Sequence, residues 1–264
     1  MDGSQVKAIR RTYARGAGIA VLVSVLSVLI LHLGPGLIAG GARATGTSDL
    51  ANIAAYYSHP SMLPYWWQGG ISLIGLILFA VLFRRYLLTF SLSPLTSGLV
   101  DLATAATVAV TPLYAMSAGM ESAMVQLVSA GEAGRGALLG VFSSWDWIYN
   151  SFAYFFEAGY MGAWAIVAWR SGALPRWIAV VGGATAVGHV FNSQVLMSHF
   201  SDNLTLLPTA FFFIWLVSAG IYLVRGGNAV IERPNAGARA EQLRSFDSVH
   251  EHGHLIVANP FWRL

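Results

Sequence analysis

The chain has 264 residues, of which 56% are hydrophobic and only 10% are charged, with a formal net charge of +3 and no cysteine. In an ordinary soluble domain about a quarter of the residues are charged. This chain has too few charged residues to cover the surface of a soluble protein, so that class is excluded. The absence of cysteine excludes disulfides, thiolate metal sites and thiol nucleophiles. The composition therefore predicts an all-α integral membrane protein.

Six segments are long and apolar enough to cross a bilayer, since a spanning helix needs roughly 20 mostly apolar residues. They are approximately 17–40, 66–83, 97–128, 138–169, 176–197 and 207–224. The apolar run 17–33 is longer than the core of a signal peptide, which has about 7–15 residues, so we expect the first segment to be retained. The predicted fold is a polytopic membrane helical bundle with six transmembrane helices in a domain of residues 1–225.

Basic residues are unevenly distributed between the ends of these segments. An even number of spans places both termini on one side, and thirteen of the fifteen basic residues fall there. They are Lys7, Arg10, Arg11, Arg15, Arg84, Arg85, Arg170, Arg176, Arg225, Arg233, Arg239, Arg244 and Arg263. Cytoplasmic loops carry the excess of Lys and Arg, so we expect both termini in the cytoplasm and the protein in the plasma membrane. The pI of about 9.3 then reflects topology and not nucleic-acid binding.

Two stretches lie outside the predicted spans. In the outer loop, Leu50, Ile53, Ala54 and Tyr57 recur at helical spacing, which predicts a short helix lying on the outer surface like a lid. Residues 226–264 form a polar cytoplasmic tail that contains the sequence HEHGH. Zinc sites need three or four converging ligands, so this alternation is weak evidence for a metal clamp; we assign no metal site, and binding of a metal by the tail stays open.

The depth of polar side chains can be counted from the basic residue at the cytoplasmic end of each span. Glu157 is 13 residues from Arg170, and His189 is 13 residues from Arg176. A rise of about 1.5 Å per residue places both at about 20 Å, on helices whose short connection favours antiparallel packing. Charged residues at mid-membrane commonly mark ligand or proton pathways. We therefore predict that Glu157 and His189 are neighbours and form the candidate catalytic pair.

Other polar residues are expected nearer the outer side, some at a depth of roughly 25 Å and some at the interface, at about 36 Å. The first set is Gln68, Asn192 and His32, and the second is Asp146 and Glu121. Asp146, Asn150 and Glu157 are separated by 4 and 7 residues, so we expect them on one helical face. The prediction is an outward-facing polar cavity with Glu157 and His189 at its floor. The predicted ligand-binding residues are His32, Gln68, Glu121, Asp146, Asn150, Tyr154 and Asn192.

Packing and lining residues can also be predicted. The segment 176–197 is rich in small residues, which allow close helix packing in membranes and predict a central position in the bundle. They are Gly182, Gly183, Ala184, Ala186 and Gly188. Pro35 and Pro112 are positions where helices could break. Six aromatic residues of the fourth span could line the cavity. They are Trp147, Tyr154, Phe155, Phe156, Tyr160 and Trp164.

Two sequence motifs stand out, TSDLANIAAYYSHP before the second span and RSGALPRWIAVVGGATAVGHV at the fifth. Together they resemble a family of six-span bacterial integral membrane proteins that is classified only as a domain of unknown function. The likeness covers about residues 8–225. The resemblance implies the six-span fold and supplies no activity, so it assigns no catalytic residue.

Three functions are compatible with these observations. The first is binding of a small amphipathic or lipid-like ligand from the outer side, in a permease-like role, although no internal repeat of the kind found in transporters is visible. The second is an intramembrane enzyme that uses Glu157 as general acid on an apolar, isoprenoid- or terpene-like substrate. The third is an accessory subunit of a membrane complex or homo-oligomer. The cofactor is unknown, and a haem between His32 and His189 stays open because helix tilt can absorb their difference in depth of about 5 Å.

Overall fold

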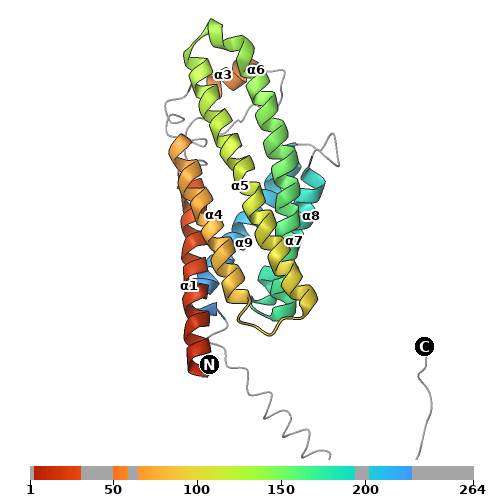
Figure 1. The fold of residues 1–264 in the computed structure, drawn as a ribbon. Coiled ribbons are helices and arrows are strands. Elements are labelled where there is room, and N and C mark those ends of the chain that lie inside the picture. The colour runs from red at the N-terminus through yellow and green to blue at the C-terminus, as the bar shows by residue number, and fades with distance from the viewer. Residues whose placement is uncertain (1–2, 31–49, 59–64, 194–201, 228–264) are drawn as a thin grey trace, which may run out of the picture. The chain divides into compact units, whose positions relative to one another are not determined.

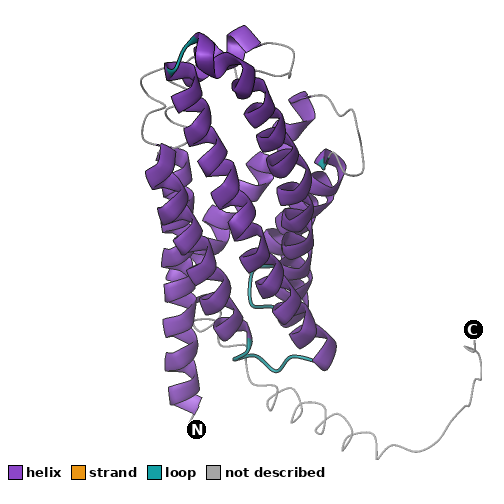
Figure 2. Ribbon diagram, turned by 45° about the horizontal axis from the view of Figure 1, so that its top comes forward, coloured by secondary structure: helices purple, strands orange, loops and turns teal. Residues whose placement is uncertain are grey.

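The computed structural model describes residues 3–30, 50–58, 65–193 and 202–227, without the side chains of 52, 65–69, 150 and 202–206. The elements are α1 (Gly3–Val28), α3 (Leu50–Tyr57), α4 (Tyr65–Leu87), α5 (Pro94–Ser129), α6 (Glu132–Trp147), the π-helix η3 (Ile148–Ala153), α7 (Tyr154–Ser171), α8 (Arg176–Asn192) and α9 (Asp202–Val224) (Figure 1). These ranges contain helices and no strand (Figure 2). The predicted all-α class is confirmed for this part of the chain.

Among the described residues, three helical stretches are long and apolar enough to cross a membrane, namely Gly70–Leu87, Pro94–Ser129 and Leu207–Val224. The predicted break at Pro112 is wrong, because α5 continues through this residue for 36 residues. Helix α5 begins where the sequence favours it: Pro94 is the first helical residue, and the Ser93 hydroxyl accepts a hydrogen bond from the Thr96 N–H at 3.3 Å.

Within the compact unit Met1–Ala229, the long helices pack as a closed ring. The order is α1, α4, α5, α7, α8, α9 and back to α1, with each helix packed against the next. Helix α8 is therefore one wall of the ring, and its predicted central position is wrong. Its glycines instead allow α9 to approach closely. A Cβ on Gly182 would lie 2.6 Å from Trp215 Nε1, and a Cβ on Gly188 would lie 2.6 Å from Pro208 Cγ.

The half of the ring that lies toward the basic helix ends is filled by large side chains, which we call the aromatic plug: Phe79 and Phe83 of α4, Trp164 of α7 and Trp215 of α9. All four are almost completely buried. Ring centroids lie 5.0 Å apart for Phe83 and Trp164 and 6.1 Å apart for Phe79 and Trp215. The Trp164 indole N–H donates to Thr107 Oγ1 at 3.3 Å, which satisfies the polar atom of this ring.

The ring helices carry apolar side chains outside, and inside they bury polar side chains beside an apolar core. Exposed apolar residues occur on every ring helix, for example Ile19, Ile74, Leu102, Ile166, Val180 and Ile214. Buried polar or charged residues include Ser24, Glu121, Glu157, Thr185, His189 and Asn192. Charged side chains of soluble proteins are mostly exposed, so this arrangement fits a protein whose exterior faces lipid.

Two local features position the site. The predicted short helix is confirmed as α3, which packs on α5 and α6 and buries Ile53 and Tyr57. Helix α7 ends at Gly172, whose φ of 63° lies in the left-handed region that favours glycine. The chain then reverses into α8, which packs along α7. This turn places residues at equal distances from it, such as Glu157 and His189, at the same level.

Candidate functional site

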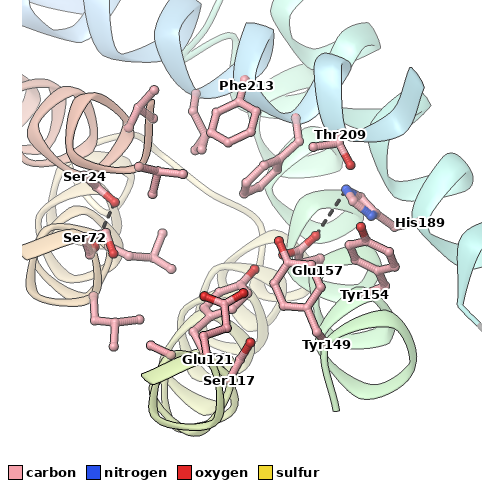
Figure 3. A pocket seen from close by; sticks show the side chains of 18 residues that line it. Ser24, Ser72, Ser117, Glu121, Tyr149, Tyr154, Glu157, His189, Thr209 and Phe213 are labelled. Carbon is pink, nitrogen blue, oxygen red and sulfur yellow. Dashed lines mark hydrogen bonds and ion pairs between the residues drawn. The ribbon is translucent and has the colours of Figure 1, made fainter. Parts of the chain in front are cut away.

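A cavity lies inside the ring, in the half that the aromatic plug does not fill. Every ring helix contributes to its wall, and η3 contributes Tyr149. The polar lining residues are Ser24, Ser72, Tyr114, Ser117, Glu121, Tyr149, Tyr154, Glu157, His189 and Thr209 (Figure 3). The cavity volume is about 140 Å³. A cavity of about 150 Å³ holds a benzene-sized molecule, so a small ligand or several water molecules fit here.

Glu157 and His189 face each other across the packed pair α7 and α8. Glu157 Oε2 lies 3.2 Å from His189 Nε2 (Figure 3), which confirms the neighbours predicted from their equal distance to the basic residues. The two residues are 3% and 1% exposed. This distance is within ion-pair range, but the angles are not those of a hydrogen bond, and neither His189 ring nitrogen has a hydrogen-bond partner among the described residues. The histidine therefore retains unused hydrogen-bonding capacity at the cavity wall.

Aromatic rings surround this pair. The ring centroid of Tyr154 lies 4.9 Å from that of His189, and that of Phe212 lies 5.8 Å away on the other side. Tyr149 continues the group, with its centroid 5.6 Å from Tyr154. Tyr154 was predicted to bind ligand, and the structure places it in the cavity wall.

The π-helix η3 explains why another prediction fails. Asp146 was expected on the face of Glu157, but it is absent from the cavity lining. A π-turn adds one residue to the helical repeat and is frequent at functional sites. With Ile148–Ala153 in this form, Tyr149 and Tyr154, five residues apart, both face the cavity. The extra residue rotates everything before it, so Tyr149 occupies the position that α-helical spacing assigns to Asn150, and Asp146 turns away.

Glu121 of α5 joins Glu157 in the cavity wall. It was expected near the outer mouth, and the structure shows it 4% exposed and directed into the same cavity (Figure 3). Ser117, one turn earlier on α5, lies beside it in the lining. The cavity therefore contains two carboxyl groups from different helices, whereas the sequence predicted one at the floor.

The remaining predicted ligand-binding residues are Asn192, which is described in full, and three residues whose side chains are not described. Asn192 is buried near the end of α8 but does not line the cavity. Gln68 and Asn150 belong to α4 and η3, and their side chains lie outside the described residues, as do His32 and the HEHGH sequence of the tail. In the described part of the chain, no group of three or more His, Asp or Glu residues could hold a metal ion.

The predicted aromatic lining is largely wrong. Trp147, Phe155 and Phe156 are exposed on the outside of the ring, and Tyr160 and Trp164 are buried in the core beside the cavity. The aromatic residues that do line it are Tyr114, Tyr149, Tyr154, Phe212 and Phe213. The sequence analysis missed the contribution of α9. Thr209 is 16 residues from Arg225, the same separation that singled out Gln68 and Asn192, and this count could have found it.

The chain matches no protein-family model, no curated protein and no solved structure. The resemblance to a six-span family rests on two sequence motifs and stays a prediction. The function of this protein is therefore inferred from its cavity.

Proposed function

We propose that this chain is a multi-pass plasma-membrane protein with six transmembrane helices and cytoplasmic termini, and that its cavity binds a small amphipathic or lipid-like ligand in a permease-like role. The three long apolar helices and the apolar exterior of the whole ring support the membrane setting. The basic residues support the orientation, because Arg84 and Arg85 end α4, Arg170 ends α7 and Arg176 begins α8. All four belong to the end of the ring that the aromatic plug fills.

The observation that carries the proposal is that the cavity has one polar wall and one apolar wall. Glu121, Glu157 and His189 come from α5, α7 and α8, while α1, α4 and α9 contribute mainly Val, Leu and Phe side chains. Small-molecule sites are mostly apolar with a few placed polar groups. A ligand with a polar group and an apolar body matches both walls at once, whereas a fully apolar ligand would leave the buried His189 nitrogens without partners.

In a permease-like role, the aromatic plug would act as the barrier to passage of the ligand. It separates the cavity from the basic end of the ring, since Trp164 lies seven residues, or about two helical turns, beyond Glu157 along α7. A ligand that enters from the other end is stopped by Phe79, Phe83, Trp164 and Trp215. Transport then requires these rings to move, whereas simple binding does not.

The contact between Glu157 and His189 also favours a second function, an intramembrane enzyme with Glu157 as general acid. A carboxyl group beside an imidazole can pass a proton to a substrate, and the faces of Tyr149 and Tyr154 can stabilise a carbocation of an isoprenoid- or terpene-like substrate. The role of an accessory subunit rests on the tail, which lies outside the described residues.

The test compares the purified full-length protein with Glu157→Gln and with the control Glu132→Gln, whose carboxylate is 89% exposed. Mass spectrometry of small molecules retained from the native membrane should find a ligand in the wild type and in the control. We expect Glu157→Gln to retain at least tenfold less of it. Conversion of the ligand by the wild type and by the control, but not by Glu157→Gln, would establish the enzyme instead. Equal retention by all three proteins, or none by any, would contradict the proposal, and a Soret band would establish haem.

A further inference from the structure

The titratable groups that line the cavity have an unusual charge balance. Two of them, Glu121 and Glu157, become negative when they ionise, and none of the described lining residues is Lys or Arg. Among the described lining residues, His189, at 3.2 Å from Glu157, is the one side chain that carries a positive charge when protonated. These described side chains thus supply more negative than positive charge to the cavity.

An ionised carboxylate that is 3% exposed has lost most of its water. Such a buried charge costs several kcal/mol unless a positive partner or several hydrogen bonds compensate it. A proton on Glu157 can provide this compensation, and a cationic ligand can provide it equally well. Proton and cation are therefore alternatives at the same oxygen atoms.

The surroundings of Glu157 suit an organic cation. Four rings lie next to one another in the order Tyr149, Tyr154, His189 and Phe212. The centroids of neighbouring rings in this series are 4.9–5.8 Å apart. The faces of aromatic rings attract ammonium groups, and more strongly where water is excluded. The His189 ring is 99% buried, points toward Glu157 (Figure 3), and has no hydrogen-bond partner for either nitrogen among the described residues. This second, independent observation indicates that a polar ligand group belongs in this space.

We propose, on the basis of the function above, that the ligand is an amphipathic organic monocation whose ammonium group binds between Glu157 and these rings in exchange for a proton. The O–H bond of Glu157 breaks, the proton leaves to water, and the carboxylate pairs with the ammonium group. One proton is released for each cation bound, and no electron is transferred. The apolar body of the ligand lies against α1, α4 and α9.

The other titratable groups around Glu157 do not change the sign of this exchange. From α5 they are Glu121 and Tyr114, from η3 Tyr149, from α7 Tyr154 and Tyr160, and from α8 His189. The described lining residues of α1, α4 and α9 include no titratable group. Because cation binding releases a proton, affinity for a cation of fixed charge rises with pH, by up to about tenfold per unit.

The experiment measures binding to the full-length protein in lipid nanodiscs by titration calorimetry. The probes are phenyltrimethylammonium, whose charge does not titrate, and tert-butylbenzene, a neutral molecule of the same shape. We expect the cation to bind at least tenfold more tightly than the neutral probe. Repeating the titration in buffers of different ionisation enthalpy should show about one proton released per cation. Glu157→Gln should weaken cation binding at least tenfold, and the exposed control Glu132→Gln should leave it unchanged.

The outcomes separate this inference from the proposed function. Equal affinity for the two probes would overturn the monocation and leave the amphipathic ligand standing. Tight cation binding without proton release would overturn the exchange with Glu157. Binding of neither probe, together with no ligand retained from native membranes, would overturn the proposed function as well. Glu121→Gln provides a second variant should Glu157→Gln unfold, and it should also weaken cation binding.

Discussion

The two halves of the helix ring are made of the same helices and differ in how their interior is filled. In one half the aromatic plug fills the interior, and its side chains are almost completely buried. In the other half the same helices leave a cavity of about 140 Å³ lined by Glu121, Glu157 and His189. Close packing in the first half supplies stability without which the second half could not keep buried polar groups together. Stability and ligand binding should therefore respond to mutation in different halves.

The largest expected effect comes from truncating the plug. Phe83→Ala removes a fully buried ring that stacks on Phe79 and lies 5.0 Å from Trp164. We expect the free energy of unfolding to fall by about 3 kcal/mol. This value is at the low end of the range for such truncations, because the unfolded chain in a membrane also lies in an apolar medium. The measurement is reversible unfolding in mixed micelles. Ligand binding by the molecules that remain folded should be retained.

The matched variant in the other half is Phe213→Ala, which removes the same type of side chain, a phenyl ring, from the cavity wall. This side chain already borders empty space, so its loss forfeits fewer contacts and should cost about 1–2 kcal/mol. It should weaken binding of the ligand, whose apolar body we place on α9. Equal losses of stability from the two variants would show that the halves are not packed differently.

An effect similar in size to that of Phe213→Ala is expected from adding a methyl group where α8 approaches α9. In Gly182→Ala the new Cβ would lie 2.6 Å from Trp215 Nε1 and 2.9 Å from Cδ1, so the plug ring must move. Such overpacking costs about 1–3 kcal/mol. The neighbouring Gly183→Ala meets no atom within 4 Å and should be neutral or stabilising, by up to about 1 kcal/mol, because alanine favours helix. Thermal unfolding of both variants checks the difference, and equal melting temperatures would contradict it.

On α7 and α8 the sequence allowed depth to be predicted better than direction, whereas the same kind of count misplaced Glu121 of α5. Rise along a helix accumulates at a fixed value per residue, so the equal counts from Arg170 and Arg176 correctly made Glu157 and His189 neighbours. The direction of a side chain depends on rotation, which one inserted residue changes by about 100°. The π-helix η3 contains such an insertion, and no residue of its sequence, IYNSFA, predicts it. This is why Asp146 was misplaced while Glu157, on the other side of η3, was not.

Ring closure could not be predicted for a related reason. The apolar pattern of α4, α8 and α9 is nearly uniform around each helix, because lipid and core both accept Leu, Val and Phe, so it does not show which face is inside. The central position predicted for α8 followed from its glycines. Their real partners, Pro208 and Trp215, belong to the following helix and are recognisable only once α8 and α9 are placed together.

The smallest expected effect concerns the contact that holds η3 against α8. The Ser193 hydroxyl, at the end of α8, donates to the Ser151 carbonyl of η3 at 3.1 Å, and both residues are completely buried. A π-helix leaves its backbone groups less regularly paired than an α-helix, so this donor from another helix stabilises the form that turns Tyr149 and Tyr154 inward. Ser193→Ala should cost about 1 kcal/mol, the usual value for a lost buried hydrogen bond. Ser144→Ala removes an exposed hydroxyl bonded within α6 and should stay within about 0.5 kcal/mol. Were the two variants equally stable, η3 would have to be held by its own sequence, and the inward position of Tyr149 would not depend on α8.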